Sequence, residues 1–164
     1  MEIKSGLAQG LLLKISHHGR NMVERNRLVG FGMTGESNLK TLIREMKPQV
    51  VPGEFVFCSI REDELESLNL PKLVFQEPEG ITIIVTKEVA NQNGLSYEST
   101  WGLISLTVHS NLEAVGFLAV VTNHLAKAGV SVNAVSAYHH DHLFVPYGRT
   151  DEVVVLLNGL SKQA

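Results

Sequence analysis

Two spacings of hydrophobic residues alternate along the chain after residue 38. Hydrophobic positions three or four residues apart predict helices over 39–46, 61–68, 87–92, 113–129 and 150–158. Runs rich in β-branched and aromatic residues predict strands over 55–60, 72–77, 81–87, 103–109, 130–138 and 142–148. The predicted order is therefore β-α-β-β-α in the first half and again in the second half.

Polar residues, prolines and glycines mark the predicted ends of these elements. Ser37 and Asn38 together are the predicted N-cap of the first helix, and Pro48 follows that helix. Thr150 is the predicted N-cap of the last helix, and Gly159 lies beyond its predicted end.

The repeated order predicts an α+β fold of two tandem ferredoxin-like modules. Each module has a mainly antiparallel sheet with its helices on one face. Neither half has an obvious fourth strand of its own, so the halves are expected to lend each other strands. Residues 50–164 would then form one folding unit.

The first 32 residues differ from the rest in composition and pattern. They contain five Lys or Arg and two Glu, several glycines, and no sustained hydrophobic period. We therefore expect a loosely structured extension over 1–32, an N-terminal module over 33–100 and a C-terminal module over 101–164; a targeting peptide is the alternative for 1–32. The stretch GFGMTG (30–35) has the spacing of a dinucleotide fingerprint but lacks a buried strand before it, which favours a linker.

Charge and composition exclude several classes of function. The net charge is −3, and residues 33–164 hold nine Lys or Arg against fifteen Asp or Glu, which argues against a nucleic-acid partner. No run is apolar enough to predict a membrane span, so no membrane partner is expected. The single cysteine, Cys58, excludes an internal disulfide and fits a reducing cytoplasm.

Several segments resemble one known family. The stretch GFLAVVTNHLAKAGVSVNAVSAY (116–138) resembles the first helix and second strand of an ACT domain. The wider stretch TVHSNLEAVGFLAVVTNHLAKAGVSVNAVSAYHHDHLFVP (107–146) resembles small tandem-ACT proteins. GEFVFCSI (53–60) and FQEPEGITIIV (75–85) resemble the preceding module of the small tandem-ACT proteins, which are related to aspartokinase regulatory domains and cytosolic arginine sensors. The resemblance covers about residues 37–161 and leaves 1–32 unexplained.

This resemblance implies a regulatory protein, which binds an amino acid or a related small metabolite where two ACT units meet. Catalysis is not expected, because the residues offer no supported pair of carboxylates, Ser-His-Asp grouping or phosphate loop, and no cofactor is expected. The partner would be a second copy of the chain or another ACT-containing protein. The family's effector loop has a Tyr-x-x-Asp-aromatic pattern; Tyr138 and Asp141 match it, while His142 takes the place of the aromatic residue. The expected ligand-binding residues are His109, Ser110, Asn111, Glu113, Gly116, Tyr138, His140, Asp141 and His142.

The physical character of these residues fits that implication. Ser110, Asn111 and Glu113 precede a helix whose first N–H groups would be open to a ligand carboxylate, and Gly116 would allow close approach. Asp141 would face the ligand's ammonium group. Ser110 and Asn111 could equally act as helix caps, and Asp141 could simply satisfy its own turn.

The cluster His139-His140-Asp141-His142 leaves other functions open. In an extended chain His140 and His142 share one face and His139 and Asp141 the other, so a four-ligand metal site is not expected. The alternatives are a metal-binding protein, a metal-assisted or acid–base enzyme, and an assembly module without ligand. The adjacent histidines also predict a response to pH near 6.5.

Overall fold

The computed structural model describes residues 35–66, 68 and 71–164. The predicted extension over 1–32 lies outside these residues, as does the glycine-rich stretch before Gly35. The described residues belong to one compact unit, Gly35–Ala164. Among them, no helix has both the length and the hydrophobicity needed to cross a membrane.

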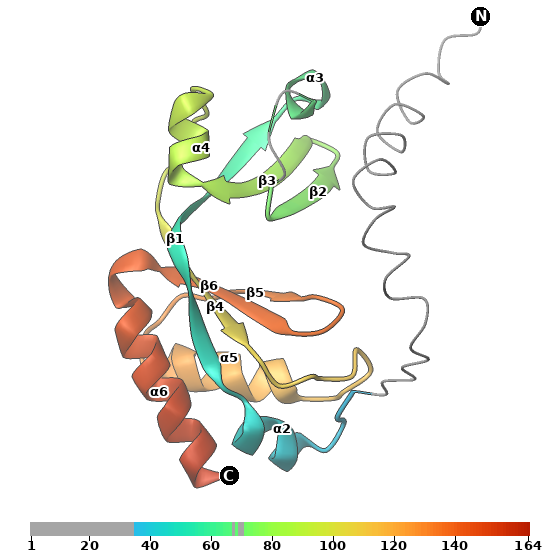
Figure 1. The fold of residues 1–164 in the computed structure, drawn as a ribbon, viewed down its shortest axis with the longest axis vertical. Helices are drawn as coiled ribbons and strands as arrows, with labels where there is room; N and C mark the ends of the chain where they lie inside the picture. The colour runs from blue at the N-terminus through green and yellow to red at the C-terminus, as the bar shows by residue number, and fades with distance from the viewer. Residues whose placement is uncertain (1–34, 67, 69–70) are drawn as a thin grey trace, which may run out of the picture. The chain divides into compact units, whose positions relative to one another are not determined.

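Within the described part of the chain, six antiparallel strands form one sheet in the order β2-β3-β1-β4-β6-β5 (Figure 1). The strands are β1 (Pro48–Ile60), β2 (Leu73–Glu77), β3 (Gly80–Thr86), β4 (Trp101–Leu106), β5 (Asn133–Ser136) and β6 (Asp141–Pro146). The antiparallel sheet with helices confirms the predicted α+β class.

Strand β1 belongs to both modules. Its first residues, up to Val51, pair with β4, and its last residues, from Phe55, pair with β3. The register shifts between Val51 and Phe55, and Gly53 in this irregular stretch has a φ of 113°. The expectation that the halves lend each other strands is therefore met, because one continuous strand serves as an inner strand of both.

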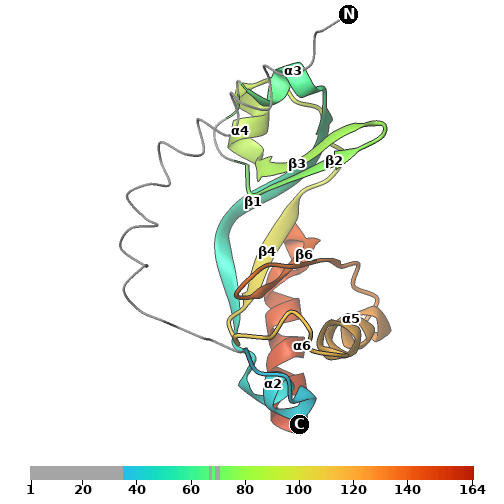
Figure 2. The ribbon, with the colours of Figure 1, turned by 90° about the vertical axis from the view of Figure 1, so that its right-hand side faces the viewer.

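The helices cover one face of this sheet. Helices α2 (Leu39–Glu45), α5 (Phe117–Lys127) and α6 (Thr150–Gln163) enclose the larger hydrophobic core, against Ile104 and Leu106 of β4 (Figure 2). Helices α3 (Glu62–Leu65) and α4 (Lys87–Gln92) flank a smaller core over β1 and β3. Successive side chains of a strand alternate between faces, so Leu103 lies on the opposite face, in an aromatic cluster with Phe55 and Phe144.

Three predicted helix boundaries are wrong for physical reasons. The helix predicted from residue 113 begins at Phe117, because Gly116 has a left-handed φ of 91° that a right-handed helix cannot contain. Thr150 is the first residue of α6 rather than its N-cap, and its hydroxyl donates to the carbonyl of Tyr147. The same helix continues through Gly159, because Leu160 beyond it packs on the core and offsets the low helix propensity of glycine.

The first strand was also predicted too short. It begins at Pro48 rather than at residue 55, since the irregular stretch after Val51 accommodates Pro52 and Gly53, which a regular inner strand would not. The predicted cap of α2 is confirmed: the Asn38 side chain accepts a hydrogen bond from the Thr41 N–H at 3.1 Å.

Candidate functional site

A turn of irregular backbone links β4 to α5 in the C-terminal module. Asn111 shapes it: its side-chain oxygen accepts from the Glu113 N–H, and its carbonyl accepts from the Ala114 N–H, both at 2.8 Å. Gly116 ends the turn as the N-cap of α5. We call residues 110–116 the site turn.

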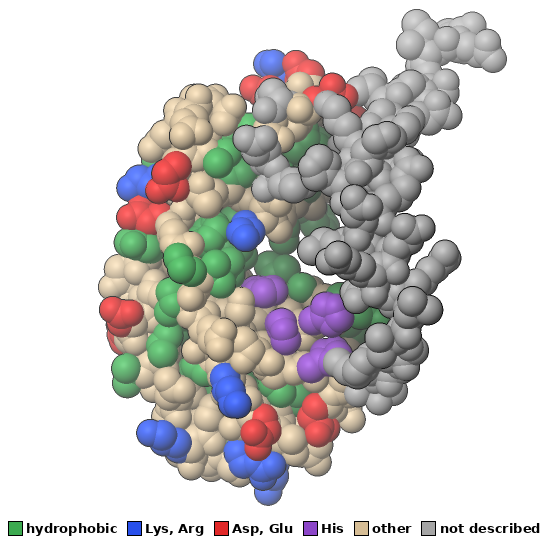
Figure 3. Space-filling model, in the orientation of Figure 1, with side chains coloured by type: hydrophobic (Ala, Val, Ile, Leu, Met, Phe, Trp, Pro, Cys, Tyr) green, Lys and Arg blue, Asp and Glu red, His purple; other side chains and the backbone are tan. Residues whose placement is uncertain are grey.

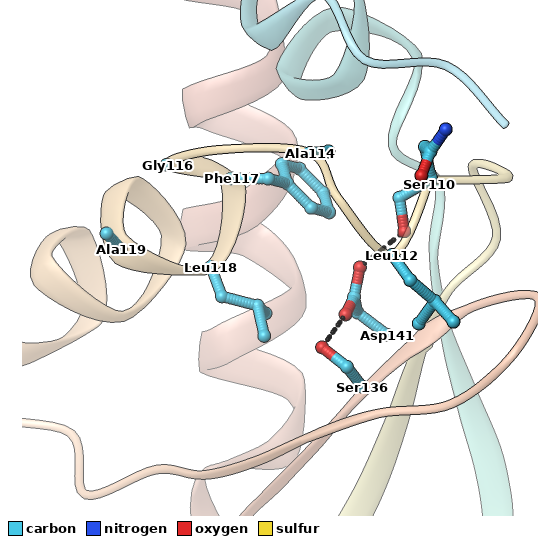
Figure 4. Close-up of a pocket in the computed structure, with 10 residues that line it drawn as sticks. Ser110, Leu112, Ala114, Gly116, Phe117, Leu118, Ala119, Ser136 and Asp141 are labelled. Atoms are coloured by element: carbon cyan, nitrogen blue, oxygen red, sulfur yellow. Dashed lines mark hydrogen bonds between the residues drawn. The ribbon is translucent and has the colours of Figure 1, made fainter.

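Asp141 lies opposite the site turn at the start of β6. The Ser110 hydroxyl donates to its Oδ2 at 2.7 Å, and the Ser136 hydroxyl donates to its Oδ1 at 2.6 Å (Figure 4). Ser136 is in place because it is the direct antiparallel partner of Asp141 across the β5–β6 pair. Two serines from different elements thus hold both oxygens of one carboxylate.

The Asp141 carboxylate is buried without a positive partner. Asp141 is 5% exposed and Ser110 is 8% exposed. Among the described residues, the ion pairs involve Arg44, Arg61, Lys87 and Arg149, and none includes Asp141. One hydroxyl donor bonds to each oxygen of the carboxylate, but these neutral donors leave its charge uncompensated.

A cavity of about 130 Å³ opens beside this carboxylate. Figure 4 shows Asp141 between the two serines, with the first residues of α5 on the other side of the cavity. Its lining residues are Ser110, Asn111, Leu112, Ala114, Gly116, Phe117, Leu118, Ala119, Ser136 and Asp141. The lining holds one acidic side chain and no basic one.

The first turn of α5 faces the same cavity. The first N–H groups of any α-helix have no acceptor within the helix, and they carry its positive dipole end. In α5 no acidic residue occupies this turn, and Gly116 offers no side chain to cap it. A negative group of a ligand would therefore be stabilised there, in the same cavity that Asp141 lines.

Histidine side chains gather on one face of the molecule (Figure 3). The ring centroid of His109 lies 5.4 Å from that of His139 and 6.4 Å from that of His140. Yet no group of three or more His, Cys, Asp or Glu side chains within residues 35–66, 68 and 71–164 has the arrangement to hold a metal ion. The geometry thus offers no support there for the metal-binding alternative.

His142 is separate from this group in its contacts. Its Nδ1 lies 2.9 Å from the Ser105 hydroxyl, in the strand pair β4–β6. Burial in the sheet lowers the pKa of His142 below its ordinary value, nearby His140 and Lys72 act in the same direction, and Asp141 acts in the opposite one. The neutral ring is therefore favoured in the folded protein.

The structure brings some of the expected ligand-binding residues together and leaves others apart. Ser110, Asn111, Gly116 and Asp141 line the cavity. The other five are not among its lining residues: His109, Glu113, Tyr138, His140 and His142. Sequence reasoning missed Ser136, although pairing the two strands around the 137–140 loop would have placed this small polar residue opposite Asp141.

Models of known families match both modules. The ACT domain model matches residues 34–101, and a second ACT domain model matches residues 97–159. No curated protein matches the chain.

Solved structures show the same arrangement of elements. A Vibrio cholerae protein of unknown function, described as a possible transport protein, is 36% identical, with a TM-score of 0.68 over 76% of this chain and 97% of that one. The Agrobacterium tumefaciens protein Atu0741 is 15% identical, with a TM-score of 0.57 over 71% of this chain and 90% of that one. The regulatory subunit of aspartate kinase from Thermus flavus is 9% identical, with a TM-score of 0.57 over 71% of this chain and 98% of that one; at such low identity, the last two show the fold alone.

The two family matches follow one another along the chain and overlap at residues 97–101, and strand β1 in the first match pairs with β4 in the second. The chain therefore belongs to the ACT-domain family of small-molecule-binding regulatory domains, with two ACT domains in tandem.

Proposed function

We propose that this protein binds a free amino acid, or a metabolite with the same ammonium and carboxylate groups, in the cavity beside Asp141. The observation that carries the proposal is the buried Asp141 carboxylate, which two serine hydroxyls orient and no cation neutralises among the described residues. A buried charge without a counter-charge is unfavourable, so an ammonium group from outside would find an oriented partner here.

The opposite end of such a ligand fits the start of α5. The cavity is lined on that side by Gly116, Phe117, Leu118 and Ala119, where the backbone N–H groups lack intrahelical acceptors. A ligand carboxylate bound there would complement the helix dipole, while its ammonium group faces Asp141. Opposite charges at the two sides of one cavity thus favour a zwitterion over a simple anion or cation.

The mouth of the cavity favours a site completed by a second ACT unit. Leu112, which lines the cavity, is 63% exposed, and Val115 of the same turn is 84% exposed. Hydrophobic side chains so exposed beside a binding site are typical of surfaces that another protein covers. We therefore propose that a second copy of this chain, or another ACT-containing protein, closes over the ligand, with His109, Glu113, Tyr138 and His140 at the rim of the interface. His142 lies on the opposite face of the sheet, beside Ser105.

Regulation rather than catalysis is the proposed role. The oriented polar groups of the cavity are one carboxylate and two hydroxyls already committed to it, an arrangement suited to holding a charge rather than to transferring a proton. Cys58, the one cysteine, is buried and free, which fits the reducing cytoplasm as the proposed location.

Thermal-shift measurements against the twenty amino acids test this proposal. A ligand present at 100 times its Kd adds about 2.7 kcal/mol to the free energy of unfolding, which is readily seen as a rise in Tm. The matched variant Asp141→Asn keeps the size of the side chain and removes its charge, so we expect it to lose the ligand-induced shift. An equal shift in both proteins would exclude the Asp141 site, and no shift with any amino acid would favour an assembly module without ligand.

A further inference from the structure

The segment before α2 clasps the site turn from outside the C-terminal module. Glu36 forms a parallel β-bridge with Ser110. Its N–H donates to the His109 carbonyl at 2.9 Å, and its carbonyl accepts from the Asn111 N–H at 3.0 Å. We call Gly35 and Glu36 the clasp, because these two bonds hold the backbone on both sides of Ser110.

Gly35 makes the closest approach in the clasp. A Cβ atom at this position would lie 2.6 Å from the Asn111 nitrogen, 2.7 Å from the Ser110 carbonyl carbon and 2.8 Å from the Ser110 carbonyl oxygen. All three are backbone atoms, and all three distances are shorter than real Cβ contacts. Any side chain at position 35 must therefore displace the clasp or the site turn.

The clasp is itself anchored to the core. The Glu36 carboxylate accepts from the N–H groups of Ser37 at 2.8 Å and Asn38 at 2.7 Å, just before α2. Helix α2 is fixed in turn by the buried side chains Leu42 and Ile43. A displacement at position 35 is therefore expected to move the site turn at least as much as the anchored segment.

The position of Ser110 matters because its hydroxyl orients Asp141. That hydrogen bond, 2.7 Å long, depends on the Ser110 backbone lying where the clasp holds it. The clasp falls within the first ACT match and the site turn within the second, so one domain would complete the site of the other.

We propose that Gly35 and Glu36 are positioning residues for the ligand site: they hold Ser110 so that the Asp141 carboxylate is aimed into the cavity. The effect on affinity rests on the proposed function, whereas the effect on the geometry of Asp141 does not. The two can therefore be measured separately.

The decisive variant is Gly35→Ala, with Gly148→Ala as its matched control. No atom lies within 4 Å of a Cβ added at Gly148, so the control adds the same methyl group without a clash. In the ligand-free, full-length protein, we expect Gly35→Ala to shift the Asp141 carboxyl ¹³C resonance and to speed amide hydrogen exchange at Asn111. Gly148→Ala should change neither. A role in stability alone would lower the Tm and leave the Asp141 resonance of the folded protein unchanged.

The second measurement is the affinity for the amino acid that gives the largest thermal shift. Gly35→Ala is expected to weaken it about tenfold or more, as Ser110→Ala should, since both disturb the hydrogen bond that orients Asp141. If Gly35→Ala does not fold, Glu36→Pro removes the N–H donated to His109 and keeps the glycine.

The outcomes separate the two proposals. A wild-type resonance and wild-type exchange in Gly35→Ala would overturn the positioning role, as would unchanged affinity. If no amino acid binds the wild type but the Asp141 resonance still shifts in Gly35→Ala, the proposed ligand is wrong and the positioning role stands.

Discussion

The two ACT modules each place a helix after an inner strand, yet they treat the start of that helix differently. In the N-terminal module, α3 has four residues and an acidic first turn, and the Glu64 carboxylate accepts from the Arg61 N–H at 2.8 Å. In the C-terminal module, α5 has eleven residues, no acidic residue in its first turn and Gly116 as its N-cap. Carboxylates of the chain itself stabilise the start of α3, whereas the start of α5 is left open to a negative group of a ligand.

The two modules also differ at the start of the strand that follows the hairpin turn, β3 in the N-terminal module and β6 in the C-terminal one. Strand β3 begins at Gly80 after a turn of two residues, while β6 begins at Asp141 after a longer loop. The N-terminal module therefore has no carboxylate at the position where the C-terminal module holds one. The C-terminal module is therefore the one that carries the carboxylate and hydroxyl groups of the candidate site.

Their cores differ as well. Among the described residues, the larger cluster contains thirteen buried residues and the smaller one seven. Helix α2 accounts for part of this difference, because it precedes β1 in the chain but packs with α5 and α6. The N-terminal segment thus strengthens the core under the site in the C-terminal module.

The largest effect is expected from Leu42→Ala, which tests whether the two modules unfold together. Leu42 lies on α2, is fully buried and packs in the larger cluster. Removing its side chain should lower the free energy of unfolding by about 2–5 kcal/mol, measured by urea denaturation. The transition should remain single, because β1 is hydrogen-bonded into both modules.

Val56→Ala in the smaller cluster is the matched control for cooperativity. It should also shift one common transition, although it removes less hydrophobic volume. Two separate transitions in either variant would mean that the shared strand does not couple the modules.

A smaller effect is expected from placing an acidic residue in the first turn of α5, where α3 has acidic residues. Ala119 is exposed, lines the cavity and occupies the third position of α5, as Glu64 does in α3. Ala119→Glu should weaken amino-acid binding about tenfold, since its carboxylate competes for the site proposed for the ligand carboxylate. Stability should stay the same or rise by about 0.3–1 kcal/mol.

Ala119→Gln separates charge from size in this experiment. It adds nearly the same volume without the negative charge, so titration calorimetry should find much of the wild-type affinity retained. Equal losses in the two variants would point to steric obstruction instead of competition for the helix start.

The topology could be predicted because it depends on periodic patterns that local chemistry imposes. The two hydrophobic spacings gave the order of elements, and Asn38 marked the start of α2 correctly. The predicted helix boundaries were wrong where the conformation of one residue, or packing against residues distant in the sequence, determined where the helix begins or ends. Gly116 delayed the start of α5 through its positive φ, and Leu160 extended α6 through contacts that no local pattern contains.

The candidate site was only partly predictable for the same reason. Asp141 and Ser110 could be selected as polar residues at strand ends, but their hydrogen bond spans thirty-one positions of the chain. Ser136 required the register of the β5–β6 pair. The clasp could not be foreseen, because nothing local to Gly35 indicates that it packs against the backbone of Ser110.

The smallest expected effect is on the pH dependence of stability. It again distinguishes the two modules, because residues 33–100 contain no histidine. The pKa of His142 is lowered in the folded protein by burial first, and then by His140 and Lys72 against the opposing effect of Asp141. Its contribution to stability is therefore fully present above the ordinary value of about 6.5 and is lost as the pH falls through the lower, folded value. Between pH 7 and 5, the Tm of His142→Gln should fall less steeply than that of the wild type, while its amide can still bond to Ser105.

Parallel pH profiles would show that the ring is protonated without cost in the fold. A flatter profile would show that a histidine of the C-terminal module alone can tune the stability of a unit that both modules share.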